Sequence, residues 1–197
     1  SSCFPMRRSR EEAARTRARI VEAAANAFRR HGINQAGIAT VMDEAGLTHG
    51  GFYKHFESKD QLIAEACEQI FRSVLQQLAA QVAPLPPERR LAAFIELYLS
   101  AWHRDHREQG CGFAALGTEL AHACAAVRAA ADRGLRQLIN TLAGFLPDAG
   151  QAQRNARAQA IAATLAGAMM LARAVGDPAL SDAMLVSARD SLLARAA

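Results

Sequence analysis

The chain has 197 residues, 51% of them hydrophobic and 21% charged, so it is long and apolar enough to bury a sizeable core. No run of about 18 uncharged apolar residues occurs, which excludes a membrane-spanning helix, and the N-terminal SSCFPMRRSR lacks the apolar segment of a signal peptide. The net charge is +4, and eight arginines against three glutamates through residue 30 give +5, so the positive excess lies at the front and favours an anionic partner.

The first elements in chain order are three helices joined by short connections. Apolar residues recur at helical spacing over residues 10–31, and Gly32 is a natural C-terminal stop. A second helix is predicted over residues 38–45 and ends at Gly46. A third is predicted over residues 49–56, with Thr48 as its N-cap. We expect residues 1–9 to be a flexible basic tail. Met6 is a candidate natural start, and the five residues before it then come either from cloning or from a misplaced start.

Six further helices are predicted after residue 57. Ser58 is a good N-cap for the fourth, in which apolar residues keep an i, i+3/i+4 rhythm as far as Val82. Prolines at 84, 86 and 87 break the chain, and the fifth helix then carries apolar residues as far as Trp102. Turns at 108–112, 147–150 and 176–178 separate helices at 113–123, 125–146, 153–175 and 181–196. The sequence therefore predicts an all-α fold of about nine helices.

The segment AGLTHGGFYKHFESK at 45–59 raises a question about its two adjacent glycines. Each glycine in a helix interior costs roughly 0.5–1 kcal/mol relative to alanine, so Gly50 and Gly51 weaken an already short helix. Two short helices joined by a tight turn form a helix-turn-helix, whose second helix enters the major groove of DNA. A helix pressed against DNA gains from absent side chains, because its backbone can then approach base edges and phosphates.

The residues Ala45, Gly46, Leu47, Thr48, Gly50, Tyr53, His55, Phe56, Ser58, Lys59 and Asp60 stand in the order of a known signature. The sequence IATVMDEAGLTHGGFYKHFESKDQL resembles the DNA-binding signature of the TetR/AcrR family of bacterial transcriptional regulators, and the likeness covers about residues 12–65. Two features depart from the family pattern. Ala36 and Gly37 stand where the family often has Thr, which leaves a weak cap, and Val41-Met42 replaces the usual Ile-Ala.

The resemblance implies an N-terminal three-helix DNA-binding domain at residues 10–57 and a helical ligand-binding and dimerisation domain at 58–197. It implies base contacts from the start of the third helix and phosphate contacts around it, with His49 the best candidate to read sequence because imidazole can donate or accept in the major groove. The alternative for each is a solvated polar side chain. The candidate DNA-binding residues are Arg17, Thr48, His49, Gly50, Gly51, Tyr53, His55 and Lys59.

Family members are dimers, so the last two predicted helices are the candidate interface, where small residues allow close helix packing into a four-helix bundle with a second copy. The alternative is that these faces pack only within one subunit. The interface candidates are Ala163, Gly167, Met170, Met184, Leu185, Ala188 and Leu192.

The resemblance also implies a small-molecule pocket in the larger domain, with candidate walls at Phe71, Phe94, Tyr98, Trp102, Cys111 and Phe113. An aromatic stripe at helical spacing is more often plain core, which is the alternative for each of these residues. Cys111 precedes a predicted helix start, where the helix dipole favours thiolate, so it is a candidate sensor of electrophiles or oxidants; the alternative is an inert thiol. A metal site from His103, His106, Cys111 and His122 is a weaker alternative, because the spacing fits no known ligand pattern.

The expected function is a ligand-responsive transcriptional regulator, most simply a repressor that binds a palindromic operator as a dimer and is released by a small-molecule or electrophile effector. The expected partners are double-stranded DNA, a second copy of the chain and an unknown effector; no cofactor, metal or membrane is expected. Four cysteines without CxxC spacing fit free thiols in a cytoplasmic protein. The alternatives are a helical ligand carrier or an enzyme, although no phosphate loop or catalytic grouping occurs.

Overall fold

The computed structural model describes residues 4–194, and within them it contains helices and no strand, which confirms the all-α prediction. We call residues 4–58 the head and residues 59–194 the body. The head consists of α1 (Phe4–His31), α2 (Ile38–Glu44) and the 3-10 helix η1 (His49–Lys54). The body consists of α3 (Lys59–Val82), α4 (Pro87–Tyr98), α5 (Ala101–Asp105), the 3-10 helix η2 (Arg107–Gln109), α6 (Gly112–Leu120), α7 (Ala125–Phe145), α8 (Gln151–Ala174) and α9 (Pro178–Ala194).

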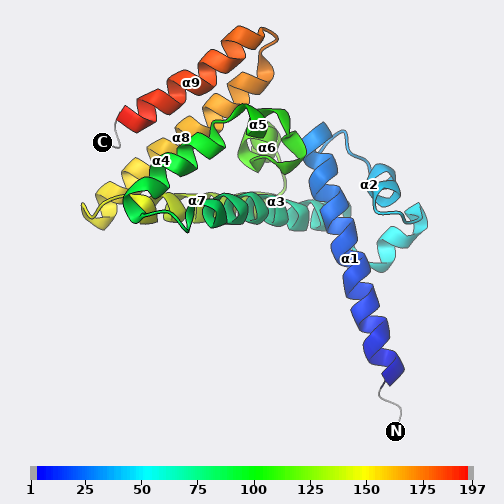
Figure 1. The fold of residues 1–197 in the computed structure, drawn as a ribbon. Coiled ribbons are helices and arrows are strands. Elements are labelled where there is room, and N and C mark those ends of the chain that lie inside the picture. Colours follow the sequence, from blue (N-terminus) through cyan, green and yellow to red (C-terminus); the bar gives the residue numbers. More distant parts are fainter. Residues whose placement is uncertain (1–3, 195–197) are drawn as a thin grey trace.

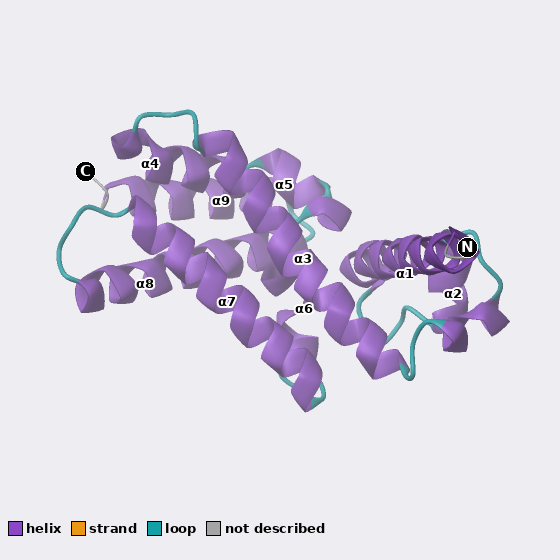
Figure 2. Cartoon of the chain, turned by 90° about the horizontal axis from the view of Figure 1, so that it is seen from below, coloured by secondary structure: helices purple, strands orange, loops and turns teal. Residues whose placement is uncertain are grey.

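The long helices of the body lie in two layers, and the head projects from one end. In Figure 1, α3 and α7 lie side by side beneath α8 and α9, and α1 runs past the end of this layer, so that its N-terminal part points away from the body. Seen from below, α1 is viewed almost along its axis, with α2 beside it (Figure 2). The first turn of α3 therefore lies beside the helix-turn-helix, and the rest of α3 lies among the other helices of the body.

Two hydrophobic clusters fill the molecule, and the first is shared by the head and the body. It contains residues of α1, α2 and η1, and it continues through the first half of α3 to Leu116 and Leu120 of α6 and to Val127 and Ala130 of α7. The second joins α4, α7, α8 and α9. The first cluster crosses the expected boundary between residues 57 and 58. A movement of α3 or α6 therefore changes the packing of side chains in the head.

Several element bounds differ from the expected ones. Helix α1 begins at Phe4, so residues 4–9 of the expected tail continue the helix, whereas residues 1–3 lie outside the described part. Pro5 stands in the first turn of α1, where its missing N–H costs nothing. The predicted fifth helix is broken after Tyr98: Leu99 leaves the helix, and the Ser100 hydroxyl accepts a hydrogen bond from the His103 N–H at 3.1 Å, which starts α5.

The third predicted helix is a 3-10 helix that ends at Lys54, and its cap differs from the expected one. Thr48 holds the N-cap position, but its side chain accepts no capping hydrogen bond, so the prediction of Thr48 as a good cap was wrong. By contrast, Ser58 caps α3 as predicted, by accepting a hydrogen bond from the Gln61 N–H at 3.1 Å. The Thr48 hydroxyl is therefore left on the surface for a partner outside the chain.

Candidate nucleic-acid interface and effector cavity

The turn between α2 and η1 is set by a glycine that no other residue replaces easily. Gly46 has φ +69°, in the left-handed region that favours glycine. Its N–H donates to the Asp43 carbonyl at 2.9 Å, and the next N–H, of Leu47, donates to the Met42 carbonyl at 2.9 Å. This is the Schellman ending of a helix, in which the hydrophobic residue after the glycine packs back on the core. The sequence AGL thus fixes the angle at which η1 leaves α2.

One face of η1 is anchored in the head and the opposite face is open. Phe52 and Phe56 are buried and their rings stack with centroids 5.5 Å apart, as the sequence predicted for the inward face. Tyr53, between them in sequence, is 68% exposed. The exposed side chains at this end of the head are those of Thr48, His49, Tyr53 and Lys54. A hydrophobic anchor under polar donors is the arrangement of a segment that is presented to a partner.

The two adjacent glycines have no structural reason within the chain. An added Cβ at Gly50 would meet nothing within 4 Å, and one at Gly51 would meet only Met42 and Thr48 side chains at an ordinary 3.7 Å. Neither residue has a positive φ. Alanine would therefore fit at both positions in the free protein and would favour the helix. Gly50 lies on the exposed side of η1, so the missing side chain leaves room for a partner such as DNA to approach the backbone.

Three residues predicted to contact phosphates flank this surface, but burial and contacts within the chain restrict their side chains. His55 and Lys59 are half-buried, and the Lys59 ammonium lies 3.5 Å from the Ile33 carbonyl, a long hydrogen bond. Arg17 is more strongly held: it forms an ion pair with Glu65 of α3, donates through Nε to the His55 carbonyl at 3.2 Å, and lies over the Phe56 ring at 4.4 Å. Arg17 therefore ties α1 to η1 and α3, and its phosphate contact stays a prediction.

Five of the six predicted pocket residues lie around one apolar cavity in the body. Phe71, Phe94, Tyr98, Cys111 and Phe113 line it, together with aliphatic residues of α3 and with Gly112, Gly134 and Leu138. The cavity is narrow, with a volume of about 20 Å³, because the rings of Phe71 and Phe113 stack with centroids 4.3 Å apart. A larger hollow of about 640 Å³ lies at the far end of the body, between the start of α4 and the α7–α8 turn, and contains none of the predicted residues.

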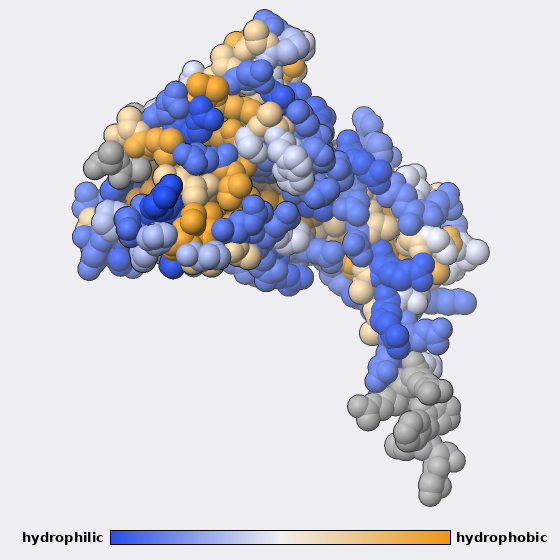
Figure 3. All heavy atoms as spheres, in the orientation of Figure 1, coloured by the Kyte–Doolittle hydropathy of each residue, from blue (hydrophilic) through white to orange (hydrophobic). Residues whose placement is uncertain are grey.

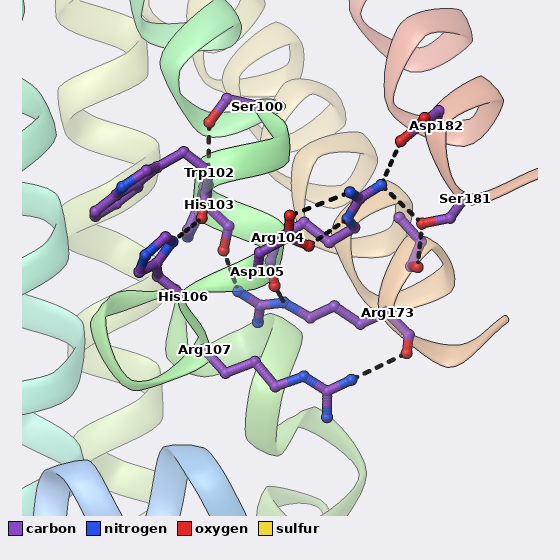
Figure 4. Close-up of polar contacts among 11 residues, drawn as sticks. Ser100, Trp102, His103, Arg104, Asp105, His106, Arg107, Arg173, Ser181 and Asp182 are labelled. Atoms are coloured by element: carbon purple, nitrogen blue, oxygen red, sulfur yellow. Dashed lines mark hydrogen bonds and ion pairs between the residues drawn. The ribbon is translucent and has the colours of Figure 1, made fainter. Parts of the chain in front are cut away.

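Trp102 is the predicted pocket residue that the structure places elsewhere. It is 50% exposed and stacks on His106, with ring centroids 4.4 Å apart (Figure 4). The break after Tyr98 is the reason, because it turns α5 out of the register that α4 would have continued. The apolar residues keep a helical spacing across this break, and for that reason the sequence predicted one continuous helix as far as Trp102.

A buried polar group lies at the edge of the cavity. His103 is 3% exposed, its Nδ1 donates to the Tyr98 carbonyl at 2.6 Å, and its Nε2 accepts from the Cys111 N–H at 2.9 Å. Burial lowers the pKa of His103 to about 4, so its ring is neutral at pH 7. The Tyr98 hydroxyl is buried beside the Cys111 thiol without a hydrogen-bond partner, and burial raises its pKa well above the ordinary value. The cavity thus offers one unsatisfied hydroxyl and one thiol.

Helix α6 connects this cavity to the head through Glu119, a residue that the sequence analysis did not single out. Cys111, at the cavity, is the N-cap of α6, and Glu119 lies in its last turn. The Glu119 carboxylate accepts the Asn34 N–H at 2.9 Å and the Ile33 N–H at 3.1 Å, directly after α1. Gly32, with φ +85°, brings the chain so close that a Cβ there would lie 2.8 Å from the carboxylate. Eighty-five residues separate these partners, so no local pattern signals the contact.

The candidate dimer face on α8 and α9 is divided between buried and exposed residues. Leu185 and Leu192 are buried within the body, so their assignment to a dimer face was wrong; they form the contact between the two helices and the core. The other candidates are exposed or half-buried, namely Ala163, Gly167, Met170, Met184 and Ala188. On α8 the exposed apolar residues recur every three or four positions, from Ala156 through Ala160, Ala163, Gly167 and Met170 to Ala174. The hydrophobic atoms visible in Figure 3 gather on the body, whereas the head is mainly hydrophilic.

The residues of the alternative metal site are not brought together. His103 uses both ring nitrogens for backbone contacts, and His122 is exposed just beyond the opposite end of α6 from Cys111. Among residues 4–194, no group of three histidines, cysteines or carboxylates is placed to hold a metal ion. Within the same range, every helix is too short or too polar to cross a bilayer.

Comparison with known proteins matches both parts of the chain. The family model described as bacterial regulatory proteins, tetR family, matches residues 20–66, and the model described as tetracyclin repressor-like, C-terminal domain, matches residues 87–187. The HTH-type transcriptional regulator TtgR of Pseudomonas putida is 35% identical over 103 residues, which cover 49% of this chain and 49% of TtgR. The HTH-type transcriptional repressor BepR of Brucella suis is 44% identical over 54 residues, 27% of this chain and 26% of BepR.

Solved structures extend the likeness over nearly the whole chain. A TetR-family regulator from Cytophaga hutchinsonii has a TM-score of 0.77 at 22% identity and covers 93% of this chain and 96% of its own. The reduced form of NemR from E. coli has a TM-score of 0.74 at 21% identity and covers 90% of this chain and 95% of its own. At these identities the likeness establishes the fold, and the chain spans half or less of the two curated relatives described above.

Proposed function

Because the chain belongs to the TetR family of bacterial regulatory proteins, we propose that it represses transcription by binding a palindromic DNA operator as a dimer and that an effector in the body releases it. The family consists of transcriptional regulators, which sets the enzyme alternative aside. The observation that carries the proposal is the open space at Gly50, on a segment whose other face is anchored by Phe52 and Phe56.

The exposed face of η1 is the part of the proposal that meets DNA. Gly50 lets the backbone approach the floor of the major groove, and His49 offers a ring nitrogen to a base edge. Tyr53 and Thr48 offer hydroxyls to phosphates on the two sides of the groove. Phosphate contacts of this kind position a protein on the duplex, and sequence is read by the few groups that reach the bases.

A symmetric operator needs two heads about 34–36 Å apart, and the apolar stripe of α8 supports a dimer that provides them. Its small residues allow a partner helix to approach closely, and an added Cβ at Gly167 would meet nothing within 4 Å in the single chain. A glycine inside a helix is unfavourable without a reason, and close packing against a second α8 supplies one.

Replacing Gly50 with Ala tests the DNA interface directly. The variant should fold at least as stably as the wild type, with a gain of up to about 1 kcal/mol in urea unfolding, because a helix prefers alanine and the space is free. Its affinity for DNA from the region upstream of its own gene should fall at least ten-fold in a mobility-shift titration, repeated at two salt concentrations. The matched control is Gly144→Ala on the exposed face of α7, where an added Cβ also meets nothing within 4 Å. Equal DNA affinity for Gly50→Ala and the wild type would remove the basis of the proposal.

The effector is proposed to act at the aromatic cavity. At about 20 Å³ the cavity has room for about one water molecule, so any larger occupant must displace Phe71 or Phe113. Phe71 belongs to α3, which leads to the head, so its displacement can tilt α3 and change the separation of the two heads. Such coupling is typically about 1–3 kcal/mol. An apolar molecule with one polar group would satisfy the Tyr98 hydroxyl.

Cys111 gives the cavity a second way to respond, by reaction with an electrophile. Cys111 is buried but lines the cavity, whereas Cys67 is fully buried, does not line it, and has a thiol pKa that burial raises to about 12. The described E. coli NemR structure is a reduced form, which supports looking for thiol chemistry here. We expect N-ethylmaleimide to release DNA from the wild type and from Cys124→Ser, whose cysteine is exposed, but not from Cys111→Ser. Release of DNA from Cys111→Ser at the wild-type rate would assign the effect to another group.

A further inference from the structure

A second hollow lies between the head and the body, and its walls are basic. It has a volume of about 480 Å³ and is bordered by the end of α1, the loop after it, η2, α6 and the end of α8. Four arginines line it, Arg29, Arg30, Arg107 and Arg173, against one carboxylate, Glu119. Arg30 also forms an ion pair with Glu44 of α2 at 2.6 Å, which leaves an excess of two positive charges. We call it the basic cleft. Its volume lies in the range of small-ligand sites.

Two of these arginines hold buried N–H groups that have no acceptor. The Arg29 Nε and one terminal nitrogen of Arg173 are buried and unpartnered. A buried charged donor without an acceptor costs about 1–3 kcal/mol or more, so native proteins rarely keep one unless something else satisfies it. Arg29 has one other contact, from a terminal nitrogen to the Asn26 side-chain oxygen at 3.0 Å. Because Arg29 borders the cleft, the terminal N–H groups that Asn26 leaves free are available to a molecule there.

Arg107 and Arg173 place two positive charges on the body side of the cleft. Arg107 donates to the Arg173 carbonyl at 3.1 Å, and Arg173 donates to the carbonyls of His103 at 2.7 Å and Arg104 at 3.2 Å. Figure 4 shows the two side chains running alongside each other in opposite directions, with their guanidinium groups at opposite ends. These contacts use carbonyl oxygens and neutralise no charge. The burial of Arg173 and of Arg29 lowers the pKa of each guanidinium, which is the mark of cations held out of water.

The carboxylates near the cleft do not balance these cations. Glu119 is occupied by the N–H groups of Ile33 and Asn34. Glu108 in η2 lies near enough to raise the pKa of Arg29, and Glu44 of α2 is already paired with Arg30. An additional anion is therefore what the charge distribution lacks.

We propose that the basic cleft binds a small organic anion, through a phosphate or carboxylate group that accepts hydrogen bonds from Arg29 on the head and from Arg107 and Arg173 on the body. Guanidinium groups suit both oxyanions because their planar N–H pairs match two oxygens at once. DNA is not the occupant, since the cleft lies at the body end of α1, away from the exposed face of η1 (Figure 1). The site is also distinct from the aromatic cavity, with which it shares no lining residue.

The test uses the full chain without DNA and two probes, inorganic phosphate and citrate. Each is titrated by calorimetry at constant ionic strength against a chloride background, so that general salt effects cancel. We expect saturable binding of at least one probe to the wild type, at least ten-fold weaker binding to Arg29→Gln, and at least three-fold weaker binding to Arg107→Gln. The matched control is Arg128→Gln, which removes an exposed arginine of α7 far from the cleft lining and should bind as the wild type does.

The outcomes distinguish a phosphate ligand from a carboxylate ligand, and both from the absence of an anion site. Tighter binding of phosphate assigns the site to phosphorylated molecules, and tighter binding of citrate assigns it to carboxylates; both support the proposal. Absence of saturable heat with either probe, or equal affinity of Arg29→Gln and the wild type, overturns it. Arg29→Gln is the decisive variant because the Arg29 side chain makes one hydrogen bond among the described residues, to Asn26. Thermal unfolding of the variant shows whether it folds. None of these results depends on DNA binding, so a failure here leaves the repressor proposal standing.

Discussion

Lowering the pH from 7 to 4 is expected to cost the fold about 3 kcal/mol through His103 alone. The imidazole has an ordinary pKa of 6.5 in the unfolded chain, and burial lowers it to about 4 in the folded one. The folded state therefore binds the proton less readily than the unfolded state does. The contribution of His103 to the free energy of unfolding is therefore fully present above pH 6.5 and is lost as the pH falls towards 4. Protonation would also place a donor on Nε2 against the Cys111 N–H, which now donates to it.

Urea unfolding at several pH values, for the wild type and for His103→Gln, measures this share. Carboxylates also titrate in this range, so the informative quantity is the difference between the two profiles. The variant should be less stable at pH 7 and should lose less stability on acidification. His106→Gln is the matched control, because His106 is half-buried and contacts only the Trp102 carbonyl and ring. Parallel profiles for the wild type and His103→Gln would show that His103 does not cause the loss.

Removing the Glu119 carboxylate is expected to loosen the junction between the head and the body. In Glu119→Ala the N–H groups of Ile33 and Asn34 lose their acceptor, which should lower the free energy of unfolding by about 1–3 kcal/mol. The amide hydrogens of these two residues should exchange with solvent much faster, because they lose their hydrogen bonds to the Glu119 carboxylate. A structural link from the cavity to the head would then be cut, so an effector bound in the body should release DNA less efficiently.

The control for this variant is Glu68→Ala, which removes the same charge from an exposed ion pair with Arg133. Surface pairs contribute about 0–1 kcal/mol, so this variant should stay close to the wild type. Hydrogen exchange followed by mass spectrometry distinguishes the two, since only Glu119→Ala should lose protection in the loop after α1. Unchanged protection there would mean that the carboxylate does not hold the loop in solution.

Local patterns predicted most of the helices and the inward face of η1 well. The i, i+3/i+4 rhythm located the long helices within a few residues, because each buries one apolar face in a shared core. The glycine after α2 and the serine before α3 are end signals whose chemistry is local, and both act as the sequence indicates. The inward position of Phe52 and Phe56 follows from their spacing alone.

The errors arose where distant contacts override a local pattern. The apolar rhythm runs past Tyr98, but a serine cap three residues before His103 starts a new helix and turns Trp102 outward. Leu185 and Leu192 have the spacing of an interface, and only the packing of α9 on α8 assigns them to the core of one chain. Periodicity identifies a buried face without saying what covers it.

Two parts of the site left no signal that a single sequence carries. Glu119 reaches a loop eighty-five residues away, and the arginines of the basic cleft come from α1, η2 and α8. In the sequence each of these residues is an ordinary charge on a helix, and such charges are usually solvated. The function proposed for them can be inferred only when the fold has placed the end of α1 against η2 and α6.

Trp102 is the chain's one tryptophan, and its position on α5 makes it a natural reporter. Its indole is half in water and stacked on a histidine ring, so its fluorescence responds to small changes of solvent contact. The next residue, His103, contacts Tyr98 and Cys111 at the cavity and Arg173 at the cleft. Emission from a single unlabelled chromophore can therefore follow events at either place in real time, with no dye attached and no DNA in the cuvette.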